Sequence, residues 1–274
     1  MLSQLERYRR RGHKKVKGWL EPGAVEMILA LAKKQADLGI AGHIAEIGVY
    51  QGRLFILLSL LRRPGEKAVA IDLFDLGALH ADASAEGDRA KMMVNLARHS
   101  DAKDVLVHQG SSTELSSPFL VSLAGGECRV FSVDGGHTAE IVAHDLGTAE
   151  SSLAPGGILI QDDFFNELWP DVAVATVRYF GQPRGIVPFA VGGNKVMFCH
   201  PAYVAEYRMA LTDRAPKTTE RKFLGCDVLC LNFESPWLEK RIPGQTWWRA
   251  VRNTAPGRAV RQLYHDCLSK FCVQ

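Results

Sequence analysis

Residues 43–61 read HIAEIGVYQGRLFILLSLL, a short apolar strand followed by a glycine turn and an apolar helix. The turn, Glu46-Ile-Gly-Val-Tyr-Gln-Gly52, has the spacing E-x-G-x-x-x-G, which differs from the G-x-G-x-x-G of dinucleotide-binding enzymes. Glycines in such a turn let a ligand approach the backbone, and the first N–H groups of the helix are available to bind it. The stretch therefore predicts a ligand-binding turn at the carboxyl end of a buried strand.

Strands and helices alternate on both sides of this stretch, beginning with a helix from Pro22. Apolar runs predict further strands at residues 67–71, 105–108, 128–133 and 158–161, and helical spacing predicts helices at 86–99, 115–123, 138–153 and 171–180. Residues 186–191 and 196–199 are joined by Gly192-Gly193-Asn194, which is too short for a crossover helix, so this pair is expected to be antiparallel. The pattern predicts an α/β fold, a doubly wound, seven-stranded, mostly parallel sheet with a terminal antiparallel hairpin.

Composition places the chain among ordinary globular proteins. It has 274 residues, of which 47% are hydrophobic and 23% are charged, so it is neither disordered nor fibrous. The longest apolar run, Phe55–Leu61, is far shorter than the roughly 20 residues that cross a membrane. The basic start lacks the apolar core of a secretory signal, so a cytoplasmic protein is expected. The six cysteines are expected to be reduced thiols, because their spacing does not favour a zinc site.

Charge and composition divide the chain into three parts. Residues 1–20 form a basic N-terminal arm with seven Lys or Arg against Glu6, and residues 21–200 hold the alternating pattern. Residues 201–274 are expected to be an irregular C-terminal extension with a helix around 258–271, which caps a substrate pocket or forms a subunit interface. Its aromatic residues would stack on a sugar or bury a helix; they are Trp237, Trp247 and Trp248.

Polar residues stand where the predicted strands end, which in doubly wound sheets is where ligands bind. Asp72 ends the second strand and is placed to accept hydrogen bonds from a ribose diol. Ser111 and Ser112 follow the third strand, where they suit an adenine edge or cap the next helix.

Carboxylates follow the fourth and fifth strands. Asp134 and His137 come after the fourth strand, and Asp162 and Asp163 come after the fifth. These strands should be neighbours, so three carboxylates converge, and a hard divalent cation would relieve their repulsion. Oxygen ligands favour magnesium, calcium or manganese over zinc. His137 is expected to approach the same pocket without being a ligand.

Together these motifs resemble those of a known family. Glu46-Ile-Gly-Val-Tyr-Gln-Gly52, Asp72, Val133-Asp134-Gly-Gly-His137 and Pro155-Gly-Gly-Ile-Leu-Ile-Gln-Asp162-Asp163 are similar to motifs of class I S-adenosylmethionine-dependent methyltransferases. More narrowly, they resemble the metal-dependent O-methyltransferases of the macrocin type, which act on sugar hydroxyls of antibiotics and glycosides. A looser likeness connects them with catechol O-methyltransferases. The resemblance covers about residues 19–200 and implies a Rossmann-like methyltransferase fold with an S-adenosylmethionine-binding domain at 21–200.

The resemblance also implies roles for individual residues. S-adenosylmethionine would be bound by Glu46, Gly48, Tyr50, Gly52, Asp72, Ser111, Ser112 and Asp134. Mg²⁺, or another hard divalent cation, would be bound by Asp134, Asp162 and Asp163. His137 would be the base, with Asp134 beside it in catalysis.

The expected activity is transfer of a methyl group from S-adenosylmethionine to a hydroxyl of a small molecule, a sugar or glycoside. A catechol or phenol acceptor is the first alternative. An NAD-dependent oxidoreductase is disfavoured by the glycine spacing and by the strand-end carboxylates. Nucleic-acid methylation is also disfavoured, although the basic arm would suit phosphate contacts or another anionic surface. Related enzymes commonly self-associate, so a homo-oligomer is expected.

Overall fold

The structure, a computed structural model, describes residues 2–76, 87–213 and 218–232. The helix expected around 258–271 and the three C-terminal tryptophans, Trp237, Trp247 and Trp248, lie outside these residues. Within them, no helix is long and apolar enough to cross a membrane.

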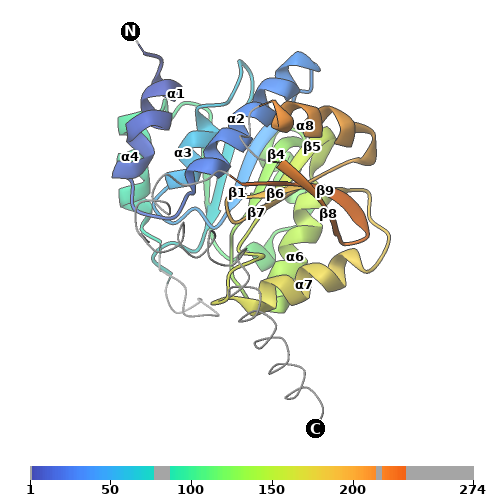
Figure 1. The fold of residues 1–274 in the computed structure, drawn as a ribbon. Helices are drawn as coiled ribbons and strands as arrows, with labels where there is room; N and C mark the ends of the chain where they lie inside the picture. The colour runs from blue at the N-terminus through green and yellow to red at the C-terminus, as the bar shows by residue number, and fades with distance from the viewer. Residues whose placement is uncertain (1, 77–86, 214–217, 233–274) are drawn as a thin grey trace, which may run out of the picture. The chain divides into compact units, whose positions relative to one another are not determined.

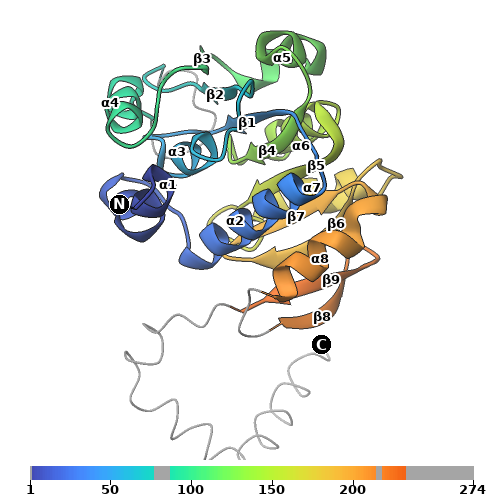
Figure 2. The ribbon, with the colours of Figure 1, turned by 90° about the horizontal axis from the view of Figure 1, so that it is seen from above.

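A twisted sheet of nine strands runs through the described part of the chain (Figure 1). Figure 2 shows the strands in the order β3-β2-β1-β4-β5-β7-β6-β9-β8. Their bounds are β1 His43–Ile47, β2 Ala68–Asp72, β3 Val105–Gln109, β4 Cys128–Val133, β5 Leu153–Asp162, β6 Val187–Gly192, β7 Lys195–Cys199, β8 Thr218–Phe223 and β9 Cys226–Leu231. Strands β1 to β5 are parallel, and β7 pairs antiparallel with both β5 and β6. The strand order reverses between β1 and β4, which is where doubly wound sheets bind ligands.

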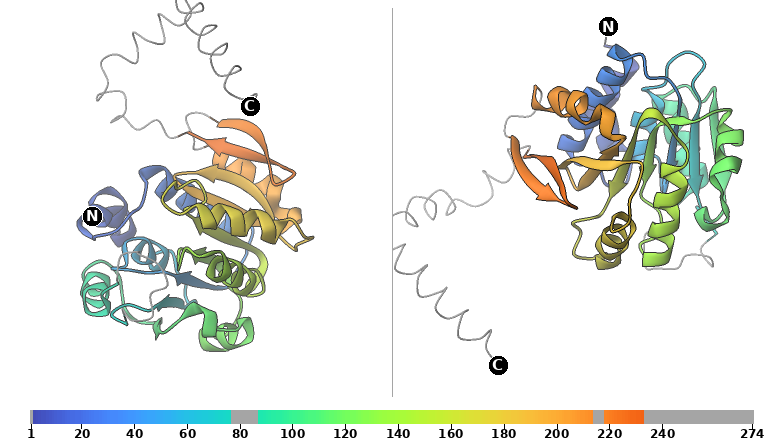
Figure 3. Two further views of the ribbon diagram at one scale, coloured as in Figure 1. Left: turned by 90° about the horizontal axis from the view of Figure 1, so that it is seen from below. Right: turned by 90° about the vertical axis from the view of Figure 1, so that its right-hand side faces the viewer.

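Helices cover both faces of the sheet (Figures 2 and 3). The α-helices are α1 Gln4–Arg7, α2 Pro22–Asp37, α3 Arg53–Ser59, α4 Arg89–His99, α5 Ser117–Ala124, α6 Ala139–Glu150, α7 Pro170–Phe180 and α8 Val204–Thr212. Side chains of α2, α3, α4 and α8 share one apolar cluster, whereas those of α5, α6 and α7 share a second. Alternate residues of the central strands enter the two clusters, as period-two side-chain geometry requires.

The α/β class and the seven strands expected up to residue 199 are confirmed, but the sheet continues beyond them. Residues 201–213 and 218–232 are not irregular, because they form α8 and the antiparallel hairpin β8–β9, and β9 pairs with β6. The sequence TTERKF of β8 is polar because this strand lies at the exposed edge of the sheet, so it carries no apolar strand signal. The start of β5 also differs from expectation, since α6 ends at Glu150 and β5 already begins at Leu153, before Pro155.

The basic N-terminal arm packs onto the sheet domain. After α1 it forms a π-helical turn at Tyr8–Gly12 and a 3-10 turn at His13–Lys15. Tyr8 is buried, its hydroxyl donates to the carbonyl of Arg53 at 2.8 Å, and its ring contacts that of His99. Arg9 pairs with Glu26 of α2 at 2.7 Å. The arm is therefore built into the fold, with one of its basic side chains neutralised by α2.

A buried ion pair ties the sheet to the helices. Arg129 of β4 is almost fully buried, and its guanidinium donates two hydrogen bonds to Glu66 at 2.9 and 2.8 Å. It also donates to Gln35 of α2 at 2.9 Å and to the carbonyl of Leu61 at 2.7 Å. Burial alone would raise the pKa of Glu66, but the hydrogen bonds and charge of Arg129, together with hydrogen bonds from Arg63, outweigh it and lower that pKa.

We expect Glu66→Gln to lower the free energy of unfolding by about 3–5 kcal/mol at pH 7, because the buried Arg129 charge loses its partner. Because the folded pKa of Glu66 lies below its unfolded value near ~4.3, the stabilisation is present above that pH and is lost as the pH falls further. Urea denaturation at pH 7 and pH 3 measures both effects. The control is Asp37→Asn, which breaks an exposed pair with Lys33 and should cost at most about 0.5 kcal/mol. A loss below about 1 kcal/mol for Glu66→Gln would contradict this account.

Candidate active site

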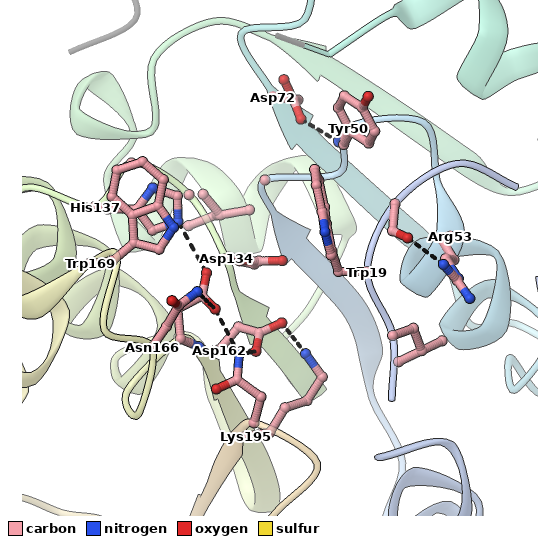
Figure 4. A pocket seen from close by; sticks show the side chains of 18 of the residues that line it. Trp19, Tyr50, Arg53, Asp72, Asp134, His137, Asp162, Asn166, Trp169 and Lys195 are labelled. Atoms are coloured by element: carbon pink, nitrogen blue, oxygen red, sulfur yellow. Dashed lines mark hydrogen bonds and ion pairs between the residues drawn. The ribbon is translucent and has the colours of Figure 1, made fainter. Parts of the chain in front are cut away.

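A cavity of about 840 Å³ opens where the parallel strands end (Figure 4). Its walls include Gly48 and Tyr50 after β1 and Asp72 at the end of β2. They also include residues that follow β3, β4 and β5, namely Ser111, Ser112, Asp134, His137, Asp162 and Asp163. Most of the predicted site residues therefore line one space, which is within the size range of small-molecule sites.

The turn after β1 needs its glycine. Gly48 has φ +82°, and a Cβ there would lie 1.6 Å from the carbonyl oxygen of Asp134. Only glycine lets the tips of β1 and β4 approach this closely. Tyr50, also in the left-handed region at φ 52°, donates its backbone N–H to Asp72 at 2.7 Å and so joins the turn to the end of β2.

Two of the residues predicted to bind S-adenosylmethionine do not line the cavity. Gly52 is the N-cap of α3 at φ +90°, where it shapes the turn. Glu46 is buried in β1, and its Oε2 has no hydrogen-bond partner in the described part of the chain. Burial raises the pKa of Glu46 well above its usual range, and the charge of Lys195 acts in the opposite direction. Oε2 of Glu46 is thus a buried hydrogen-bond acceptor that lies two residues before Gly48.

Asp134, His137 and Asp163 come together at one wall of the cavity, and Figure 4 labels the first two of them. One ligand atom of each lies within 4.8 Å of those of the other two. The Nε2 atom of His137 is 3.3 Å from Oδ2 of Asp163. The His137 ring stacks on Trp169, with centroids 4.2 Å apart and planes at 10°. This arrangement fixes the imidazole beside two carboxylates.

The pKa values of the two carboxyl groups in this cluster are shifted in opposite directions. Burial and the neighbouring charge of Asp162 raise the pKa of Asp134 well above its usual value. Burial would also raise the pKa of Asp163, but hydrogen bonds from His137, Asn166 and Asn194 lower it overall. Asn166 and Asn194 donate to its Oδ1 at 2.9 and 2.7 Å. Asp163 is therefore held as an anion, whereas ionised Asp134 needs a nearby cation.

Asp162 faces a different partner from the one expected. Its Oδ2 pairs with the buried ammonium of Lys195, and its Oδ1 accepts from the backbone N–H of Asp163 at 3.0 Å and from Asn194 at 3.3 Å. It contributes no oxygen to the Asp134–His137–Asp163 cluster. The ion pair with Lys195 thus takes the place of the third ligand predicted from the sequence.

Sequence reasoning missed several residues of the cavity. Lys195 is the direct antiparallel partner of Asp162 in the β5–β7 register, so the short hairpin loop was the signal that could have revealed it. Trp19 lies just before α2, and the loop 165–169 follows Asp163; both segments line the cavity. No motif or periodicity marks these two segments.

The central part of the chain matches a known protein family. A family described as "Methyltransferase domain" matches residues 45–164, the span from β1 to the residue after Asp163. No curated protein sequence matches the chain.

Solved structures of similar fold include methyltransferases. The chain is 18% identical to CalS11, a calicheamicin methyltransferase, covering 64% of this chain and 77% of that one at a TM-score of 0.50. An apo structure of CalS11, described as a TDP-rhamnose 3'-O-methyltransferase, gives 19% identity, 66% and 81% coverage and the same TM-score. The O-methyltransferase NovP gives 16% identity, 65% and 80% coverage and a TM-score of 0.50.

At these identities the structural likeness shows the fold alone. The matched domain indicates the chemistry, which is methyl transfer. The domain contains residues 45–47 of β1, the glycine turn, Asp72, Asp134 and Asp163, which supply one part of the cavity wall. The strand order agrees with a cavity at the switch point of a doubly wound sheet. The chain therefore carries a methyltransferase domain at residues 45–164, and its fold is similar to that of the methyltransferases named above.

Proposed function

We propose that the protein moves the methyl group of S-adenosylmethionine to a hydroxyl oxygen of a small molecule, a sugar or glycoside, with a divalent cation at Asp134 and Asp163 and with His137 as the base. The observation that carries this proposal is the meeting of two carboxylates and an imidazole inside the strand-end cavity of a methyltransferase fold. CalS11 is described as a sugar O-methyltransferase and NovP as an O-methyltransferase, which supports an oxygen acceptor.

The residues around the β1 turn suit the donor. Oε2 of Glu46, which has no hydrogen-bond partner among the described residues, is an acceptor for an ammonium group, such as that of the methionine part of the donor. Asp72 lines the cavity at the end of β2 and accepts the backbone N–H groups of Tyr50 and Phe74, and we propose that it also faces the ribose. Ser111 and Ser112 line the far side of the cavity, where they would face the adenine.

The Asp134–His137–Asp163 cluster suits a hard cation. A positive charge next to Asp134 removes the cost that keeps the pKa of that carboxyl high. Carboxylate oxygens are ligands that Mg²⁺ and Mn²⁺ accept. When bound, S-adenosylmethionine supplies a methyl group on a sulfonium, and the cation supplies a Lewis acid that stabilises negative charge on an acceptor oxygen.

The chain's own residues orient the acceptor and take up its proton. His137 accepts the hydroxyl proton as the acceptor oxygen takes the methyl group, and Trp169 holds the imidazole plane in place by stacking. The hydrogen bonds from Asn166 and Asn194 keep Asp163 ionised and fixed. The segment that contains Trp19 and the loop 165–169 wall the cavity and restrict the access of water.

A phenol or catechol acceptor is the second candidate, because two tryptophans, Trp19 and Trp169, are among the residues that line the cavity. Self-association, contact of the N-terminal arm with an anionic surface and a cytoplasmic location stay predictions.

Asp163→Ala should lower turnover about a thousandfold, because loss of Lewis-acid stabilisation removes several kcal/mol from the transition state. The measurement is formation of S-adenosylhomocysteine with TDP-rhamnose or catechol as the acceptor. The affinity for S-adenosylhomocysteine should stay within about threefold, because the β1 turn is intact. Excess chelator should reduce wild-type turnover to a similar extent, and full activity in chelator would contradict the metal assignment.

His137→Ala should lower kcat by about a hundred- to ten-thousandfold with little change in KM, because a general base acts mainly in the transition state. The matched control is His108→Ala, since His108 of β3 does not line the cavity. Steady-state kinetics of both variants make the comparison. A rate equal to that of the wild type would return His137 to a structural role.

A further inference from the structure

Three large apolar side chains are exposed at the walls of the cavity. Trp19 is 73% exposed, Leu168 is 72% exposed and Phe165 is 54% exposed. They are three of the four most exposed large hydrophobic residues in the described part of the chain, and all three line the cavity. They form what we call the apolar rim. An apolar surface that gathers at a pocket, instead of scattering over the molecule, marks a binding surface.

Trp19 is displayed by a fixed segment. Its neighbours Val16 and Leu20 are buried, and the guanidinium of Arg53 donates to the carbonyl of Gly18. The Trp19 ring lies 5.6 Å from that of Tyr50, in the turn after β1. In Figure 4 the Trp19 indole stands across Asp134 from the stacked pair of His137 and Trp169. The exposure of this indole is therefore a fixed property of the fold, because both ends of its segment are anchored.

The other half of the rim is held by the turn that also holds Asp163. Asn166 donates its side-chain N–H to Asp163 Oδ1 at 2.9 Å, and its side-chain oxygen accepts from the backbone N–H of Leu168 at 3.0 Å. The backbone N–H of Asn166 donates to the carbonyl of Asp163 at 3.1 Å. One hydrogen-bonded turn thus sets a carboxylate of the proposed cation site and presents Phe165 and Leu168.

The hairpin β8–β9 supports this turn from outside the matched domain. Phe223, the last residue of β8, contacts Phe164 at 4.9 Å and Phe165 at 6.0 Å between ring centroids. Phe164 and Phe165 are themselves 4.7 Å apart. Phe223 does not line the cavity, so its contact acts through Phe165. It is a positioning residue for the rim.

We propose that the acceptor is amphiphilic: its hydroxyl end enters beside the Asp134–His137–Asp163 cluster, and a flat apolar body lies on Trp19, Phe165 and Leu168. The inference rests on the proposed function, which supplies the hydroxyl end, and adds the chemical class of the remainder. A free sugar would leave the rim in water, whereas an aromatic body would bury it and gain the stacking surface of the indole. An aryl glycoside and a fused-ring phenol share this chemistry.

Two pairs of probes test the proposal, each with the same hydroxyl end and a different body. Methyl β-D-glucoside is compared with 4-methylumbelliferyl β-D-glucoside, and catechol is compared with 2,3-dihydroxynaphthalene. Calorimetric titration into the full-length protein, loaded with S-adenosylhomocysteine and Mg²⁺, measures the dissociation constants. We expect the larger member of at least one pair to bind at least tenfold more tightly, and the pair that shows this distinguishes a glycoside from a phenol.

Variants show whether the rim causes the preference. Trp19→Ala and Leu168→Ala should reduce it to less than threefold, and Phe223→Ala should weaken it, whereas Phe223→Leu should restore it. Val177→Ala is the matched control, because Val177 is an exposed apolar residue of α7 away from the cavity. Equal affinities within both pairs, no binding of any probe, or a preference that survives the rim variants would overturn the proposal.

The affinity for S-adenosylhomocysteine separates this result from a failure of the proposed function. If the rim proposal alone is wrong, all variants bind S-adenosylhomocysteine as the wild type does and the larger probes have no advantage. If the wild type does not bind S-adenosylhomocysteine, the proposed function fails, and the rim proposal, which depends on it, fails as well.

Discussion

Repulsion among four carboxylates gathered at neighbouring strand tips is the constraint on which the site depends. Glu46, Asp134, Asp162 and Asp163 lie in or just after β1, β4 and β5, and ionising all of them at these largely buried positions is costly. Neighbouring side chains reduce this cost. Lys195 pairs with Asp162, and His137 and two asparagines donate hydrogen bonds to Asp163. Asp134 keeps a pKa well above its usual value, so the cost of ionising this carboxyl is the electrostatic cost that remains. Asp134 lies at the wall of the cavity where we propose that a cation and a sulfonium bind.

The sequence predicted the central part of this arrangement well, for a physical reason. Parallel strands end at one edge of a sheet, so Asp134, Asp162 and Asp163 could be placed at one edge without knowing any distance, although only Asp134 and Asp163 meet in the cluster. Lys195 could not be assigned in the same way, because its contact with Asp162 depends on the exact register of an antiparallel pair. The edge strand β8 was missed because solvent exposure leaves it polar, and Trp19 was missed because a single aromatic residue before a helix has no periodicity.

The wall of the cavity connects the two halves of the proposed reaction. The turn at Asn166 fixes Asp163 on its inner side and presents Phe165 and Leu168 on its outer side. An acceptor that rests on these side chains would therefore contact the same turn that orients a ligand of the cation. Segments outside the matched domain, the N-terminal arm and the hairpin β8–β9, supply or support the rim.

The most direct test of the cation site is a crystal structure with Mn²⁺ and S-adenosylhomocysteine, with anomalous scattering used to locate the metal. The account predicts one anomalous peak at coordination distance from carboxylate oxygens of both Asp134 and Asp163, beside His137 and next to the donor product. A peak elsewhere, or no peak with the donor product bound and both carboxylates facing solvent, would contradict it.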